Sequence, residues 1–129
     1  MQELTYPLGT REGFDAETSA LKVPPHSIEA EQSVLGGLML DNTAWDHIAD
    51  LVNEDDFYRR DHRLIFRAIR ELAGKSHPFD VVTLAEWLKN INEIGNAGGL
   101  AYLGTLAMNT PSAVNIKAYA AIVRERAIL

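Results

Sequence analysis

The chain has 129 residues, of which 47% are hydrophobic and 23% charged, and its net charge is −6. This length suits one globular domain with a real core and is short for two. Because the sequence has no cysteine, disulfides, cysteine–zinc sites and thiol catalysis are excluded, and its acidity makes it a poor candidate for gripping a phosphate backbone by itself.

The N-terminal part of the chain divides into a tail and a first helix. Residues 1–22 are polar and without a clean period, so we predict a flexible tail. Val23-Pro24-Pro25 cannot be helical, because each proline fixes its own φ. Ser27 then predicts an N-cap for a helix that runs to about Leu40. Gly36-Gly37 costs this helix roughly 1 kcal/mol per glycine relative to alanine, so we expect a neighbouring helix to approach closely there.

Five further helices follow from apolar residues at helical spacing. We expect them over residues 43–52, over residues 61–73, after a cap at Asp80, over residues 100–107, and after a cap at Ser112. No segment alternates strongly with period two. The predicted fold class is therefore all-α, a compact orthogonal bundle of about six helices. The last helix shows no closing turn, which is typical of one arm of a longer element.

The inner faces of two of these helices are predicted from the same spacing. We place Ile91 on the inner face of the helix capped by Asp80, and Leu100 on the inner face of the next helix. Before the helix over residues 43–52, Asp41-Asn42 are good capping residues, and Thr43 with Asp46 resembles a capping box.

One helix carries a basic cluster. Arg63, Arg67 and Arg70 share one face by their spacing of four and three. They could bind phosphates or an acidic partner. The alternative, which we favour, is a solvated face paired with nearby acids, because no aromatic row or glycine-rich loop accompanies the arginines.

No catalytic, cofactor or metal residues are predicted. The acids at 54–56 are consecutive and do not form a converging oxygen cage. The four histidines, among them His62, are scattered without zinc-site spacing. Glu31 is interpreted as an acid favoured by the helix dipole. No apolar run approaches the roughly 20 residues of a membrane span, and no secretion signal is evident, so we expect a cytoplasmic protein. The residues alone predict a helical module for contact with other proteins.

Several motifs in sequence order carry a specific resemblance from about Val23 to the end. They are PPHSIEAEQSVLGGLMLDNTAWDHIADLV, DFYRRDHRLIFRAI, DVVTLAEWL, GGLAYLGTLA and NTPSAVNIKAYAAIVRER. Together they resemble the N-terminal domain of the bacterial replicative DNA helicase family.

This resemblance implies a parent protein that is a hexameric, ATP-driven DNA helicase moving on single-stranded DNA at the replication fork. Its RecA-like motor domain, with ATP and magnesium, is expected to lie outside this chain. The N-terminal domains of the family form a collar that pairs subunits and docks primase, and a helicase loader is a further partner. The implied division is a head over residues 23–110 and the start of a helical hairpin over residues 111–129.

Without the second hairpin arm, we expect this chain to be monomeric or weakly dimeric. The alternative is a free-standing helical adaptor of the replication machinery without a motor, and the sequence beyond Leu129 would separate the two. A small enzyme would need a catalytic pair that the sequence does not show.

The candidate interface residues lie mainly on the last helix. Ile122, Arg126 and Leu129 fall off its core stripe, so we predict subunit or partner contacts there. The alternative is that they close over the head. Arg63, Arg67 and Arg70 form a second candidate surface. We expect Ile122→Asp to weaken pairing and to leave helicity intact, whereas a loss of helicity would place Ile122 in the core.

Overall fold

The computed structural model describes residues 26–129, and this part of the chain consists of helices and loops. Its α-helices are α2 (Ile28–Leu40), α3 (Trp45–Ile48), α4 (Arg60–Gly74), α5 (Val81–Asn90), α6 (Gly99–Asn109) and α7 (Ile116–Ala127). Two short 3-10 helices, η2 (Asn42–Ala44) and η3 (Glu54–Asp56), lie between them. No strand occurs within residues 26–129, which confirms the all-α prediction. The predicted tail, residues 1–22, lies outside the described residues.

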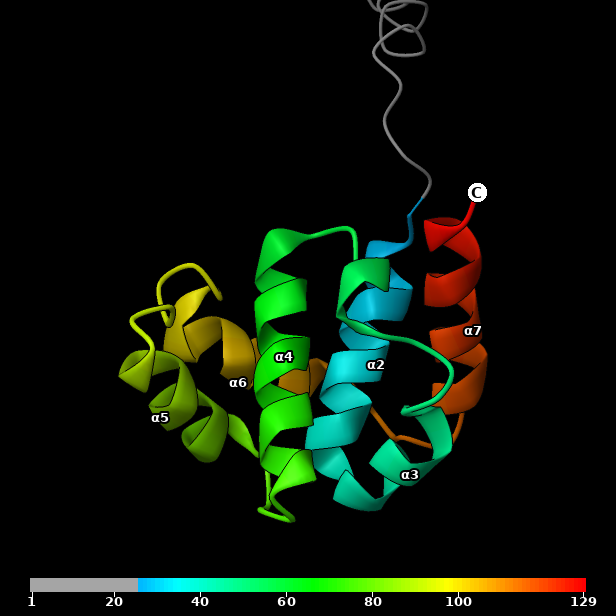
Figure 1. The fold of residues 1–129 in the computed structure, drawn as a ribbon. Coiled ribbons are helices and arrows are strands. Elements are labelled where there is room, and N and C mark those ends of the chain that lie inside the picture. Colours follow the sequence, from blue (N-terminus) through cyan, green and yellow to red (C-terminus); the bar gives the residue numbers. More distant parts are fainter. Residues whose placement is uncertain (1–25) are drawn as a thin grey trace, which may run out of the picture.

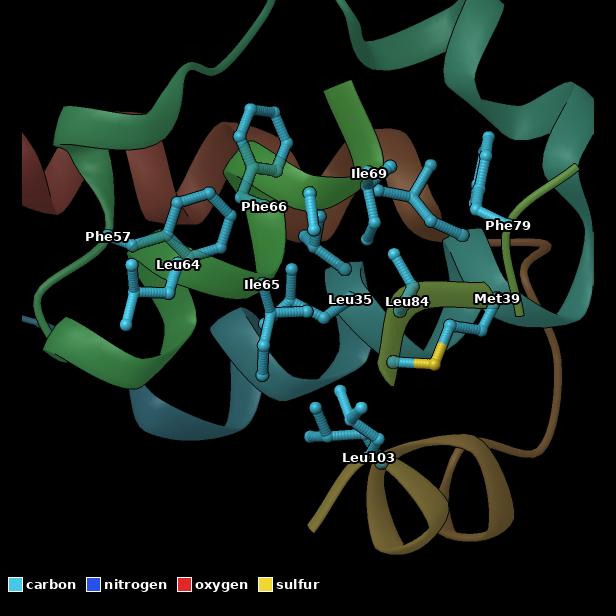
Figure 2. Close-up of a cluster of buried hydrophobic side chains, with 14 of the residues drawn as sticks. Leu35, Met39, Phe57, Leu64, Ile65, Phe66, Ile69, Phe79, Leu84 and Leu103 are labelled. Atoms are coloured by element: carbon cyan, nitrogen blue, oxygen red, sulfur yellow. The ribbon is translucent and has the colours of Figure 1, made fainter. Parts of the chain in front are cut away.

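Helix α2 is the centre of the bundle. It packs against α4, α6 and α7, and α5 lies at the outer edge against α4 and α6 (Figure 1). Figure 2 shows the core that results, in which Leu35 of α2, Ile65 of α4, Leu84 of α5 and Leu103 of α6 come together. Each of these side chains is buried. Burial of this kind stabilises a fold by roughly 1.5–3 kcal/mol per large apolar side chain.

The start and the middle of α2 follow the prediction. The Ser27 hydroxyl accepts a hydrogen bond from the Ala30 N–H at 3.2 Å, as expected of an N-cap. The glycine pair lies where α6 and the start of α7 cross α2. A Cβ on Gly36 would come within 2.5 Å of the Leu106 carbonyl oxygen, and a Cβ on Gly37 within 3.2 Å of Ile116. The close approach that the glycines predicted is therefore confirmed.

The predicted helix over residues 43–52 is much shorter in the structure. The predicted capping residue Asp41 is confirmed, because its carboxylate accepts from the Thr43 N–H at 3.1 Å at the start of η2. The predicted capping box of Thr43 with Asp46 does not form. The chain then forms η2 and the single turn α3. It leaves the α-helical path because the Leu51 N–H bonds to the Ile48 carbonyl three residues back, which tightens the turn and delivers Val52 into the core.

The helix starts and faces later in the chain are partly as predicted. Asp80 caps α5 by accepting from the Thr83 N–H at 2.9 Å. Ser112 does not cap the last helix, because its hydroxyl accepts from Val114 inside the preceding loop and α7 begins only at Ile116. Two residues expected on inner faces, Ile91 and Leu100, are exposed, since Ile91 follows the last turn of α5 and Leu100 lies on the outer side of α6. Within the described residues, no helix is both long and apolar enough to cross a membrane.

Candidate functional site

Three of the predicted interface residues line one hollow of about 440 Å³, which we call the α4–α7 hollow. Arg63 comes from the first turn of α4, Arg126 comes from the last turn of α7, and Leu129 follows the end of α7. The wall between them is the loop that links η3 to α4. The complete lining is Asp55, Asp56, Phe57, Tyr58, Arg63, Arg126, Ala127 and Leu129.

The two arginines of this hollow bond to backbone carbonyls. Arg63 donates from Nε to the Phe57 carbonyl at 2.7 Å and from Nη2 to the Tyr58 carbonyl at 3.3 Å. Arg126 donates from Nη1 to the His26 carbonyl at 3.1 Å. Among residues 26–129, no carboxylate forms an ion pair with either guanidinium. Each guanidinium has five N–H donors, so both retain charge and donors for a group outside the domain.

Arg67 and Arg70 are engaged differently, because both bond to the carboxylate of Glu54. Arg67 donates from Nε to Glu54 at 3.0 Å, and Arg70 lies 3.1 Å from the other oxygen. The hydrogen bond from Arg67 holds the pKa of Glu54 below its usual range, and the same bond raises the pKa of Arg67. These two arginines therefore fasten η3 to α4, whereas Arg63 bonds to the carbonyls of the loop that follows η3.

The shared carboxylate predicts a pH-dependent contribution to stability. Because the pKa of Glu54 is lower in the folded state, the ionised form favours folding above the unfolded pKa, and this contribution is lost as the pH falls through the folded pKa. We expect Glu54→Gln to lower the free energy of unfolding at pH 7 by about 0.5–1 kcal/mol, a value discounted for the partly exposed arginines. Urea denaturation at a series of pH values should show that the difference in the free energy of unfolding between the wild type and Glu54→Gln becomes smaller below pH 4.5.

A matched control for this prediction is Glu86→Gln. Glu86 is exposed and lies 3.3 Å from Lys89 in a pair on the surface of α5. The stability of this variant should stay within about 0.5 kcal/mol of the wild type at every pH. An equal loss in both variants would contradict the role given to Glu54.

Ile122 does not join the α4–α7 hollow. It lines a shallow hollow between the start of α2 and α7, together with Ala30 and Tyr119. Its side chain is half-buried and packs against the edge of the core. The structure thus separates Ile122 from Arg126 and Leu129, although Arg126 lies on the same helix only one turn further on.

A buried polar network, which was not predicted from the sequence, joins α2, α4 and α6. Glu31 is 2% exposed and His62 is 0% exposed. The Glu31 carboxylate lies 2.7 Å from His62 Nδ1 and accepts from the Tyr58 N–H at 2.7 Å. His62 Nε2 lies 2.6 Å from the Tyr102 hydroxyl. Nearby, Arg59 pairs with Asp61 and lies 5.2 Å from the centroid of the Tyr102 ring.

The positions of two of its residues along their helices could have predicted this network. Glu31 stands on the same helical stripe as Leu35 and Leu38, and His62 stands on the stripe of Phe66 and Ile69. A polar or ionisable residue at an apolar position of each of two helices is typical of groups that bond to each other in the core. Within residues 26–129, no group of three metal-ligating side chains comes together.

Residues 26–129 thus form an all-α domain with a hollow, lined in part by arginines, where the end of α7 meets the loop before α4. The chain matches the family model described as the DnaB-like helicase N terminal domain over residues 23–125. It therefore belongs to this family of helicase N-terminal domains.

Individual relatives agree with this assignment. The chain is 51% identical to the replicative DNA helicase DnaB of Haemophilus influenzae over 115 residues, which cover 89% of this chain and 25% of the relative. It is 40% identical to the replicative DNA helicase DnaC of Bacillus subtilis over 108 residues, which cover 84% of this chain and 24% of the relative. The crystal structure of the N-terminal domain of DnaB helicase from Mycobacterium tuberculosis superposes with a TM-score of 0.79 at 40% identity, covering 82% of this chain and 77% of that one. The chain spans about a quarter of the length of the curated relatives that it matches.

Proposed function

We propose that this domain serves in the collar of a hexameric replicative DNA helicase, where it pairs subunits and docks primase. In this proposal, ATP hydrolysis with magnesium and movement on single-stranded DNA belong to a motor domain in the rest of a longer protein. A helicase loader is a further partner, and the complex acts in the cytoplasm at the replication fork. Membership of the helicase family over residues 23–125 supports this assignment.

The observation that carries the proposal is the α4–α7 hollow. It combines two guanidinium groups that have no carboxylate partner among residues 26–129 with the exposed side chain of Leu129. Exposed apolar groups beside available arginines are typical of protein-binding surfaces. Arg63 and Arg126 are thus the residues that we assign to partner contact. Arg67 and Arg70 support the surface indirectly, because they fasten η3, which adjoins the loop wall.

We further propose that residues 111–129 begin a helical hairpin that pairs subunits. Helix α7 uses Ile116, Ala120 and Val123 to pack on the head, and this leaves Ile122 only half-buried. Without the second arm, residues 1–129 should sediment as a monomer or a weak dimer. A stable hexamer of this chain in analytical ultracentrifugation would contradict the role that we give to the hairpin.

The variant Ile122→Asp tests whether the half-buried Ile122 contributes to subunit pairing. Because the Ile122 side chain reaches a shallow open hollow, an aspartate there can stay hydrated, so far-UV helicity should be retained. We expect the dimerisation constant, measured by sedimentation equilibrium, to weaken at least about tenfold, equivalent to about 1.4 kcal/mol. The control is Ala121→Asp, which adds the same charge at a neighbouring exposed position of α7. Loss of helicity in Ile122→Asp would instead show that this residue belongs to the core.

A further inference from the structure

The hydrogen bonds of the buried network can be followed from donor to acceptor, beginning at Gln32 and ending at Glu31. Gln32 Nε2 lies 3.1 Å from the Tyr102 hydroxyl oxygen, and an amide nitrogen can only donate. The Tyr102 oxygen therefore accepts from Gln32, and its own proton is available for the next acceptor. Burial raises the pKa of Tyr102, so the hydroxyl keeps this proton.

In one of its two neutral tautomers, His62 is the acceptor for that proton. Its Nε2 lies 2.6 Å from the Tyr102 oxygen, and an imidazole nitrogen that accepts a proton bond cannot carry a proton itself. In that tautomer His62 holds its proton on Nδ1, which lies 2.7 Å from Glu31 Oε1. This Nδ1–H donates to the carboxylate, so every member of the chain from Tyr102 to Glu31 is satisfied.

At Glu31 the hydrogen-bond network meets the loop that forms the wall of the α4–α7 hollow. The other oxygen of Glu31 accepts from the Tyr58 N–H at 2.7 Å, and the Arg59 N–H lies 3.5 Å from Oε1. Tyr58 lines the hollow, and its carbonyl is one of the two that hold Arg63. Glu31 thus connects the loop that forms the hollow to a half-exposed tyrosine on α6, a helix outside the hollow.

We propose that Tyr102, His62 and Glu31 form a latch that fixes the loop wall of the α4–α7 hollow, with neutral His62 protonated on Nδ1. Tyr102 and Glu31 are positioning residues in this latch. Loss of the Tyr102 hydroxyl removes the donor to Nε2, so the imidazole proton can move to Nε2 and leave Glu31 with one donor fewer. A change at α6 is in this way transmitted to Tyr58. That the hollow binds a partner rests on the proposed function, whereas the latch itself does not.

Nitrogen-15 NMR of the imidazole tests the first half of the proposal in the wild-type chain. At a pH where His62 is neutral, Nδ1 should carry the proton and Nε2 should not. A wild-type spectrum with the proton on Nε2 would overturn the proposal without any variant. This measurement does not depend on a partner, so a failure of the proposed function would leave its outcome unchanged.

The variant Tyr102→Phe tests the transmission to the hollow. We expect a mixture of His62 tautomers and amide hydrogen exchange at Tyr58 that is roughly tenfold faster. The control is Tyr119→Phe, because the hydroxyl of this half-buried tyrosine makes no hydrogen bond with residues 26–129, and it should change neither signal. Exchange at Tyr58 that stays at the wild-type rate in Tyr102→Phe would show that α6 and the hollow are not coupled.

Discussion

Replacing Gly36 with alanine should lower the free energy of unfolding by about 1–3 kcal/mol, the usual cost of overpacking a core. A Cβ at this position would lie 2.0 Å from the Thr110 hydroxyl oxygen and 2.5 Å from the Leu106 carbonyl oxygen. The second of these atoms is backbone, so α6 itself would have to move away from α2. This cost exceeds the gain of about 1 kcal/mol that alanine normally brings to a helix interior.

Gly104→Ala is the matched control for this prediction. Gly104 lies within α6, and a Cβ there would meet nothing within 4 Å. The same substitution should therefore raise the free energy of unfolding by about 0.5–1 kcal/mol. Urea denaturation of both variants measures the contrast, and a Gly36→Ala protein as stable as the wild type would show that the helices do not cross as closely as described.

Replacing Glu31 with alanine should be more damaging still, and should lower the free energy of unfolding by about 2–4 kcal/mol. The change leaves the Tyr58 N–H and His62 Nδ1 without their acceptor in a buried site, and each unsatisfied buried donor costs about 1–3 kcal/mol. Removing one partner of a buried polar network is more costly than replacing the whole network with apolar groups.

The control for Glu31→Ala lies two residues earlier, in the first turn of the same helix. Glu29 is exposed, so Glu29→Ala should change the free energy of unfolding by less than about 0.5 kcal/mol. Thermal or urea denaturation of the two variants gives the comparison. Equal stability of both variants would mean that the carboxylate of Glu31 is solvated and not part of the core.

Local rules were sufficient to predict most of this fold. Ser27 and Asp80 cap helices through bonds to residues three positions away, and the glycine pair in α2 indicated a close crossing before any partner helix was known. Helix α3 was predicted too long because its end depends on where Val52 enters the core. That position is set by distant helices, and its apolar spacing alone is compatible with a continuous helix.

The polar features of the site depend on contacts that are remote in sequence. Glu31 and His62 are separated by 31 positions, and His62 and Tyr102 by 40. From the sequence alone, Glu31 is interpreted as an acid in the first turn of a helix, and His62 is interpreted as an isolated histidine. The arginine cluster shows the same limit, because only the fold reveals that Glu54 engages Arg67 and Arg70 and leaves Arg63 in the hollow.

The most direct test of the account is calorimetric titration of this chain with the C-terminal domain of primase from the same organism. We expect the wild type to bind, and the variant R126E/L129D to bind at least about tenfold more weakly, a loss of about 1.4 kcal/mol. The control K117E/A121D makes the same change in charge at exposed positions of α7 that do not line the α4–α7 hollow, and it should bind like the wild type. Absence of binding by the wild type, or equal binding by R126E/L129D, would contradict the assignment of this surface to primase.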